Sequence, residues 1–171
     1  MNKKSVDLKP IIRFLKSLPE SGDIELALLK CHLLIEEILT EIIVKASKNP
    51  QYISTARLSF MQKIHVARAL SNLSHSVWVW ESLKLLNSAR NGLAHNLNAE
   101  KTTEKLSEFT KHVLKNNPIV SPEDEYDDEV VNERFTKFHW AAYATYTVLA
   151  VHAQFDPAKV RPITSISHLL E

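Results

Sequence analysis

Apolar residues recur at helical spacing along most of this chain, and polar or proline-containing stretches separate the periodic segments. Each periodic segment is long enough for several helical turns. The pattern therefore predicts helices over about residues 6–18, 24–47, 56–70, from 77 through the stretch 89–97, 98–115 and 127–155.

The predicted helix over residues 24–47 has the most apolar sequence, "IELALLKCHLLIEEILTEIIVKAS". Asp23 is a suitable N-cap for it, because a short acidic side chain can accept hydrogen bonds from the first free N–H groups. Apolar positions take up most of its circumference and leave a narrow polar strip through His32, Glu36 and Glu37. A helix of this kind either lies at the centre of a fold or offers one side to a partner.

Glycine is scarce, with only Gly22 and Gly92 in 171 residues. Two glycines are too few for the turns of an all-β protein or for a phosphate-binding glycine loop. We therefore expect an all-α fold, an antiparallel up-and-down bundle of about five to six helices.

The chain is long enough for one domain with a substantial core. We expect this single domain to cover 1–171. Its parts are a helical core at about 22–115, an acidic linker at 118–127, a C-terminal helix at about 127–155 and a tail at 156–171.

Cysteine content indicates a cytoplasmic protein, and the overall charge does not give the strong positive potential that is typical of nucleic-acid-binding proteins. The formal net charge is only +1, and six acids gather in "PEDEYDDE", which includes the acidic segment 123–129. No apolar run reaches the roughly 18 residues of a membrane span, so we expect no membrane contact. Cys31 lies within an apolar run and is expected to be a small core residue.

The stretch "ARNGLAHNL", residues 89–97, combines residue types that suit phosphate chemistry. Residues four apart share a helix face, so Asn91 can hydrogen-bond the imidazole of His95 and orient it. Arg90 reaches the same anion only if the helix ends near His95 or if a second subunit contributes. Gly92 lets backbone or ligand come close. A simpler interpretation is a helix C-terminus, with a cation and a histidine near the last carbonyl groups and a glycine that eases the exit.

The same Arg-x4-His spacing occurs a second time, in "RFTKFH", with Arg134 and His139. Phe135 stands there in place of Asn91, so no amide can orient the histidine. We therefore expect the second copy to have no functional role.

A metal site is not expected. His32 and Glu36 lie four residues apart on one helix face, but the sequence offers no obvious third ligand. We interpret this pair as a surface hydrogen bond, and we expect no metal and no cofactor.

The apolar helix with its inner glutamate pair, followed two helices later by "RNGLAH", resembles the HEPN superfamily over roughly residues 22–115. The additional helix behind an acidic insert also resembles the mannitol operon repressor branch. The resemblance implies an all-α homodimer with Arg90, Asn91 and His95 as catalytic residues. Because HEPN domains typically pair through these helices, it also implies a cleft in which two motifs meet. Many HEPN domains are metal-independent RNA endonucleases, while others are regulatory or binding proteins.

Two functions remain open from the sequence. In the first, the protein is an RNA endonuclease of toxin or defence type, with His95 as general acid or base, Arg90 on the phosphate and Asn91 orienting His95. A cognate antitoxin or regulatory protein is then an expected partner. In the second, it is a non-catalytic regulator or scaffold dimer that binds a partner protein or a nucleotide. The acidic segment favours the second function because it repels RNA phosphate.

Overall fold

The computed structural model describes residues 6–19, 22–71, 73, 76–95, 99–117 and 133–154. Within these ranges all regular structure is helical, which confirms the predicted all-α fold. Six α-helices and one short 3₁₀ helix follow in order: α1 (Lys9–Ser17), α2 (Ile24–Ala46), η1 (Pro50–Tyr52), α3 (Phe60–Leu70), α4 (Val77–His95), α5 (Ala99–Asn116) and α6 (Glu133–Gln154).

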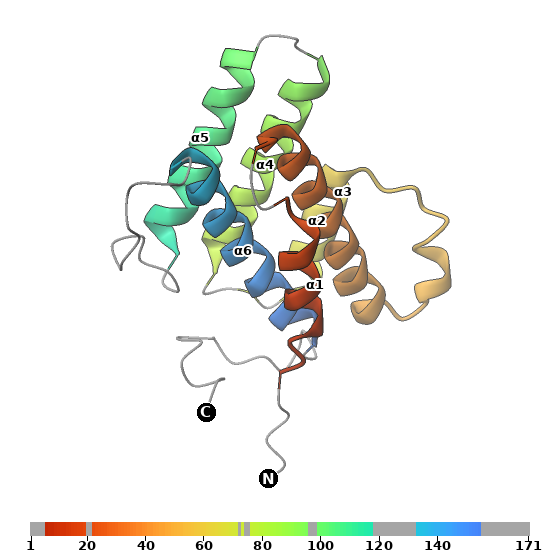
Figure 1. Cartoon of the computed structure of the whole chain (residues 1–171). Coiled ribbons are helices and arrows are strands. Elements are labelled where there is room, and N and C mark those ends of the chain that lie inside the picture. The colour runs from red at the N-terminus through yellow and green to blue at the C-terminus, as the bar shows by residue number, and fades with distance from the viewer. Residues whose placement is uncertain are drawn as a thin grey trace.

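Helix α2 has the central position, since it packs against α1, α3, α4 and α6 (Figure 1). It begins as predicted, because the Asp23 carboxylate accepts hydrogen bonds from the N–H groups of Glu25 and Leu26 at 3.0 and 2.9 Å. One half of its circumference faces the core, and the fully buried Cys31 lies there as expected. Burial raises the pKa of the Cys31 thiol, so this side chain is a core residue and not a nucleophile.

Two helices begin later than the sequence pattern suggested. Helix α3 starts at Phe60, not near residue 56, because Ser59 and Gln62 form a capping box with reciprocal hydrogen bonds. Arg57 therefore lies in the preceding loop, where its φ is 45°. Helix α1 starts at Lys9, whose N–H is bound by the Asp7 carboxylate at 3.0 Å, and Pro10 occupies its first turn.

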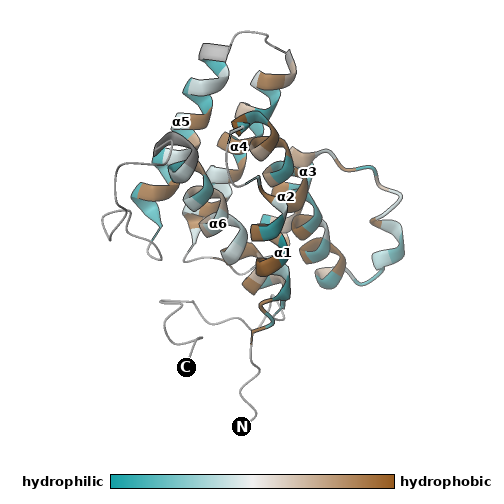
Figure 2. Cartoon of the chain, in the orientation of Figure 1, coloured by the Kyte–Doolittle hydropathy of each residue, from teal (hydrophilic) through white to brown (hydrophobic). Residues whose placement is uncertain are grey.

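Helices α4 and α5 lie side by side and antiparallel, and their joined ends extend beyond the other helices (Figure 1). Helix α4 starts at Val77 as predicted, and Trp80, Leu83, Leu86 and Ala89 on its inner side are buried. Trp80 belongs to the core, whereas Trp78 is half-buried. Hydrophobic and hydrophilic residues alternate along the same helices, as amphipathic packing requires (Figure 2).

Several predictions fall outside the described residues. These are the first residue of the helix predicted over 98–115, the acidic linker 118–127 with segment 123–129, the first turns predicted for the C-terminal helix, and the tail 156–171. None of the helices that the structure describes is both long and apolar enough to cross a bilayer.

Candidate functional site

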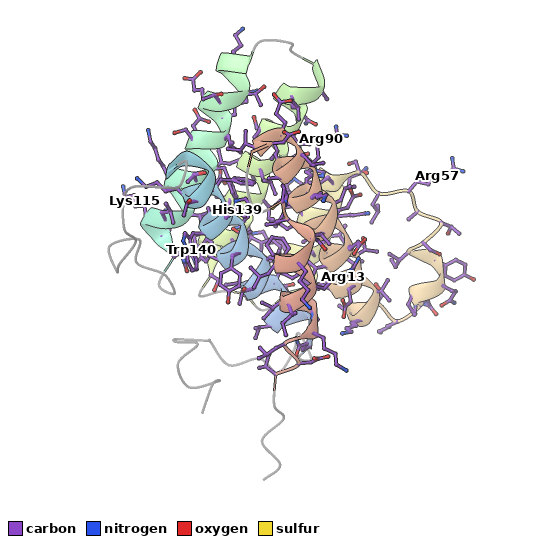
Figure 3. All side chains as sticks on the ribbon, in the orientation of Figure 1. Arg13, Arg57, Arg90, Lys115, His139 and Trp140 are labelled. Atoms are coloured by element: carbon purple, nitrogen blue, oxygen red, sulfur yellow. The ribbon has the colours of Figure 1, made fainter. Side chains whose placement is uncertain are left out.

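The predicted motif residues occupy the last turns of α4, which ends at His95. Arg90 is labelled in Figure 3 beside the upper end of α2, below the projecting ends of α4 and α5. Residues 96–98, which follow α4, lie outside the described residues, so the prediction that Arg90 and His95 serve one anion stays a prediction. The side chain of His95 lies outside the described residues, so its hydrogen bond with Asn91 stays a prediction.

The structure brings Arg90 and Asn91 together. Arg90 Nη1 donates to Asn91 Oδ1 across a long 3.4 Å, and both side chains are half-buried. Within the described part of the chain, no carboxylate forms an ion pair with Arg90. A guanidinium that lacks an internal counterion is available to a phosphate, which it can bind in a bidentate manner.

A surface pocket of about 460 Å³ opens along one face of α4. Its contributors on α4 are three or four residues apart, a spacing that places their side chains on one helix face. Asn91 belongs to both the motif and the pocket, and Arg90, which is not among the described lining residues, contacts the Asn91 amide. The described lining residues are Met61 from α3, Lys84, Asn87, Ser88, Asn91 and Gly92 from α4, and Lys105 from α5.

Gly92 permits close contact between α4 and α5. It is buried within α4, and a Cβ atom there would lie 3.3 Å from Lys105 Cδ and 3.8 Å from Thr102 Oγ1. The close approach predicted from the sequence is therefore made by side chains of α5. Because Gly92 lies inside the helix, its role is packing and not an exit from the helix.

His32 corrects the interpretation of the polar strip on α2. It does not form a surface pair with Glu36: it is buried, its ring stacks on Phe60 with centroids 3.9 Å apart, and its Nε2 lies 3.3 Å from Asn87 Oδ1. Glu36 instead pairs with Lys63 at 2.8 Å. Sequence reasoning missed this link, although His32 lies one turn from the core residues Leu28 and Ile35.

The electrostatic surroundings of His32 favour its neutral form. Burial lowers the pKa of His32, and the charges of Arg90 and Lys63 lower it further. The hydrogen bond to Asn87 and the Glu36 carboxylate raise the pKa of His32 by less than burial lowers it, although each has a larger effect than Arg90 or Lys63. A neutral ring with a hydrogen on Nε2 donates to the Asn87 carbonyl oxygen and fixes that amide.

The second Arg-x4-His copy has a structural partner. His139 Nε2 donates to the carbonyl oxygen of Pro19 at 2.8 Å and so ties α6 to the segment after α1. His139 and Trp140 lie on α6, well apart from Arg90 (Figure 3). The side chain of Arg134 lies outside the described residues. The lack of a functional role for Arg134 and His139 therefore stays a prediction.

The described side chains include no group of three or more histidine, cysteine, aspartate or glutamate residues close enough to hold a metal ion. No protein-family model, curated protein or solved structure matches the chain. The candidate site therefore rests on the residues of α4 and their neighbours.

Proposed function

We propose that this protein is a metal-independent RNA endonuclease of HEPN type that acts as a cytoplasmic homodimer. The observation that carries the proposal is the Arg90 guanidinium, which lies in the last turns of α4 without a described carboxylate partner and contacts Asn91. A cation so placed can stabilise the negative charge of a phosphate undergoing substitution.

The proposed reaction uses the 2′-hydroxyl that distinguishes RNA from DNA. His95 removes the proton from this hydroxyl, and the oxygen attacks the adjacent phosphorus. The bond from phosphorus to the 5′-oxygen breaks, and the leaving oxygen takes up a proton from a general acid. The products end in a 2′,3′-cyclic phosphate and a 5′-hydroxyl, and neither a metal nor a redox cofactor takes part.

Exposed leucines on α2 support the homodimer. Leu26, Leu29 and Leu33 lie on the outer face of the first half of α2 and are 41%, 39% and 60% exposed. Three leucines on one helix face form a surface that a second subunit can bury. Helix α2 packs against α4, so the leucine surface and the motif lie on adjacent helices.

The pocket supports a second candidate, a non-catalytic regulator or scaffold dimer that binds a nucleotide or a partner protein. Its volume of about 460 Å³ lies in the range of small-molecule sites. In this case the leucine surface and the pocket would serve binding alone, and a regulatory protein would be the partner.

A cleavage assay with purified protein separates the two candidates. We expect cleavage of a mixed RNA pool in the presence of EDTA, with 2′,3′-cyclic phosphate ends, and no cleavage of DNA of the same sequence. His95→Ala should lower the rate by about 10² or more, the usual scale for a general acid or base.

Protein that melts cooperatively but leaves RNA intact at every salt concentration tested, with and without divalent metal, would contradict the endonuclease. A wild type whose activity disappears on adding EDTA would contradict the metal-independent mechanism.

A further inference from the structure

The pocket on α4 is cationic and carries hydrogen-bond donors. Lys84 and Lys105 enter it from different helices, and the lining residues that the structure describes include no carboxylate. Lys84 also pairs with Glu81 at 3.0 Å, but that pair is exposed on both sides and therefore weak. The pocket runs from Lys84 to Gly92, about 12 Å along α4 at 1.5 Å per residue.

The two asparagines of the pocket have their carbonyl oxygens engaged on the protein side. Asn87 Oδ1 accepts from His32, and Asn91 Oδ1 accepts from Arg90. The amide nitrogens are thus the groups left for a ligand, and each can only donate. Ser88 adds a hydroxyl to the same lining.

Two ammonium groups, two amide nitrogens and a hydroxyl suit a ligand that carries negative charge and several acceptor oxygens. A phosphate group has these properties, whereas a cationic or purely apolar ligand has none of them. The length of the pocket exceeds one phosphate group, so it can follow a chain or a nucleotide.

We propose that this pocket binds phosphate groups of RNA, beside the phosphate that Arg90 holds for cleavage. Lys84 and Lys105 bind the charge, Asn87 and Asn91 donate hydrogen bonds, and His32 is a positioning residue for Asn87. The identity of the ligand as RNA rests on the proposed function. The anion-binding chemistry of the pocket stands on its own contacts.

Binding is measured separately from cleavage, by fluorescence anisotropy of a labelled single-stranded RNA in which every 2′-hydroxyl is methylated. The double variant Lys84→Gln/Lys105→Gln should raise the Kd about tenfold at low salt. The slope of log Kd against log salt should shrink by about 1.4, since each phosphate contact on a single strand contributes about 0.7. Lys101→Gln, one turn away on α5 and exposed, is the matched control and should leave the Kd within about twofold.

Asn87→Asp provides a second test that spares the fold. The aspartate keeps an acceptor for His32 but replaces the donor with a negative charge, so RNA binding should weaken more than in Asn87→Ala. His32→Gln retains a donor for Asn87 and should restore most of the binding that His32→Ala loses. Melting temperatures check that each variant is folded.

The outcomes separate this proposal from the endonuclease. If unmodified RNA is cut by the wild type but the lysine pair and Asn87→Asp leave the Kd and KM unchanged, the pocket proposal is wrong and the endonuclease stands. If RNA is bound through these residues but never cut, the endonuclease is wrong and the pocket stands. Competition by a nucleoside diphosphate that is as strong as competition by RNA would overturn RNA as the ligand and assign the pocket to a free nucleotide.

Discussion

Helices α4 and α6 carry the same Arg-x4-His spacing in different surroundings. On α4 the arginine contacts an amide at the margin of an open, cationic pocket. On α6 the histidine donates to the carbonyl oxygen of Pro19, and neighbouring residues such as Phe138 and Tyr146 are packed into the core. Spacing alone does not define a site, because the partners that surround a side chain determine whether it can meet a ligand.

Two buried histidines, one packed against α4 and one on α6, also differ in their hydrogen bonding. His32 of α2 has a hydrogen-bond partner on α4, the amide of Asn87. His152 on α6 is 1% exposed, and neither of its ring nitrogens has a hydrogen-bond partner within the described structure. The burial of His32 is therefore offset in part by a hydrogen bond, whereas the burial of His152 is not within the described structure.

The largest expected effect is the difference in cleavage rate between a substitution in the motif on α4 and one in its counterpart on α6. Arg90→Ala should lower RNA cleavage by about 10² or more, because the charge that develops on the phosphate loses its cation. His139→Ala should keep the cleavage rate within about twofold and lower the free energy of unfolding by roughly 1 kcal/mol, through loss of the bond to Pro19. Initial rates on labelled RNA and urea unfolding measure both.

Arg90→Lys is the conservative control for this pair. It keeps the charge but loses the planar fork, so it should also be severely impaired. Equal losses of activity from Arg90→Ala and His139→Ala, at unchanged stability, would show that the α6 copy takes part in the reaction.

An intermediate effect is expected at the leucine surface beside the α4 site. Leu33→Glu should convert the dimer into a monomer and lower cleavage more than tenfold, because a buried charge opposes association and the cleft needs two motifs. Sedimentation velocity at micromolar concentration should give about twice the 19.5 kDa chain mass for the wild type.

Leu15→Glu on α1, at a leucine that is 51% exposed, is the matched control and should remain a dimer. An active wild type that sediments as a monomer would be incompatible with the shared cleft.

The smallest expected effect is a loss of stability in acid. Burial lowers the pKa of His152 and is the main cause that lowers the pKa of His32. Below the ordinary histidine pKa of about 6.5 the unfolded chain therefore binds more protons than the folded chain. The free energy of unfolding should fall as the pH drops from about 7 to 5. Above about pH 7 this contribution should be constant.

His152→Leu should reduce this pH dependence and leave stability at neutral pH equal or higher, because it removes buried nitrogens that lack partners. His65→Ala, at an exposed position on α3, should leave the pH dependence as it is. Urea unfolding at several pH values measures the effect, and a curve for His152→Leu that parallels the wild type would assign the acid sensitivity elsewhere.

The sequence alone determined the helices and the position of the motif, because both depend on near neighbours along the chain. Helical periodicity and the cap at Asp23 act within one or two turns, so the start of α2 and the course of α4 could be predicted. The late start of α3 is also local, since Ser59 and Gln62 form a recognisable capping pattern. The apolar pattern of α3 continues into the loop that precedes it, so periodicity alone places the start of α3 too early.

Only the tertiary structure decided which polar groups share a site. His32 and Asn87 are 55 residues apart, and Lys105 reaches the pocket from a different helix than Lys84. The buried position of His32 also depends on Phe60 of α3. Such contacts arise from the way helices pack, and packing joins residues whose separation along the chain carries no signal of their meeting. The motif could thus be identified in the sequence, whereas the pocket forms only when α3, α4 and α5 pack against one another.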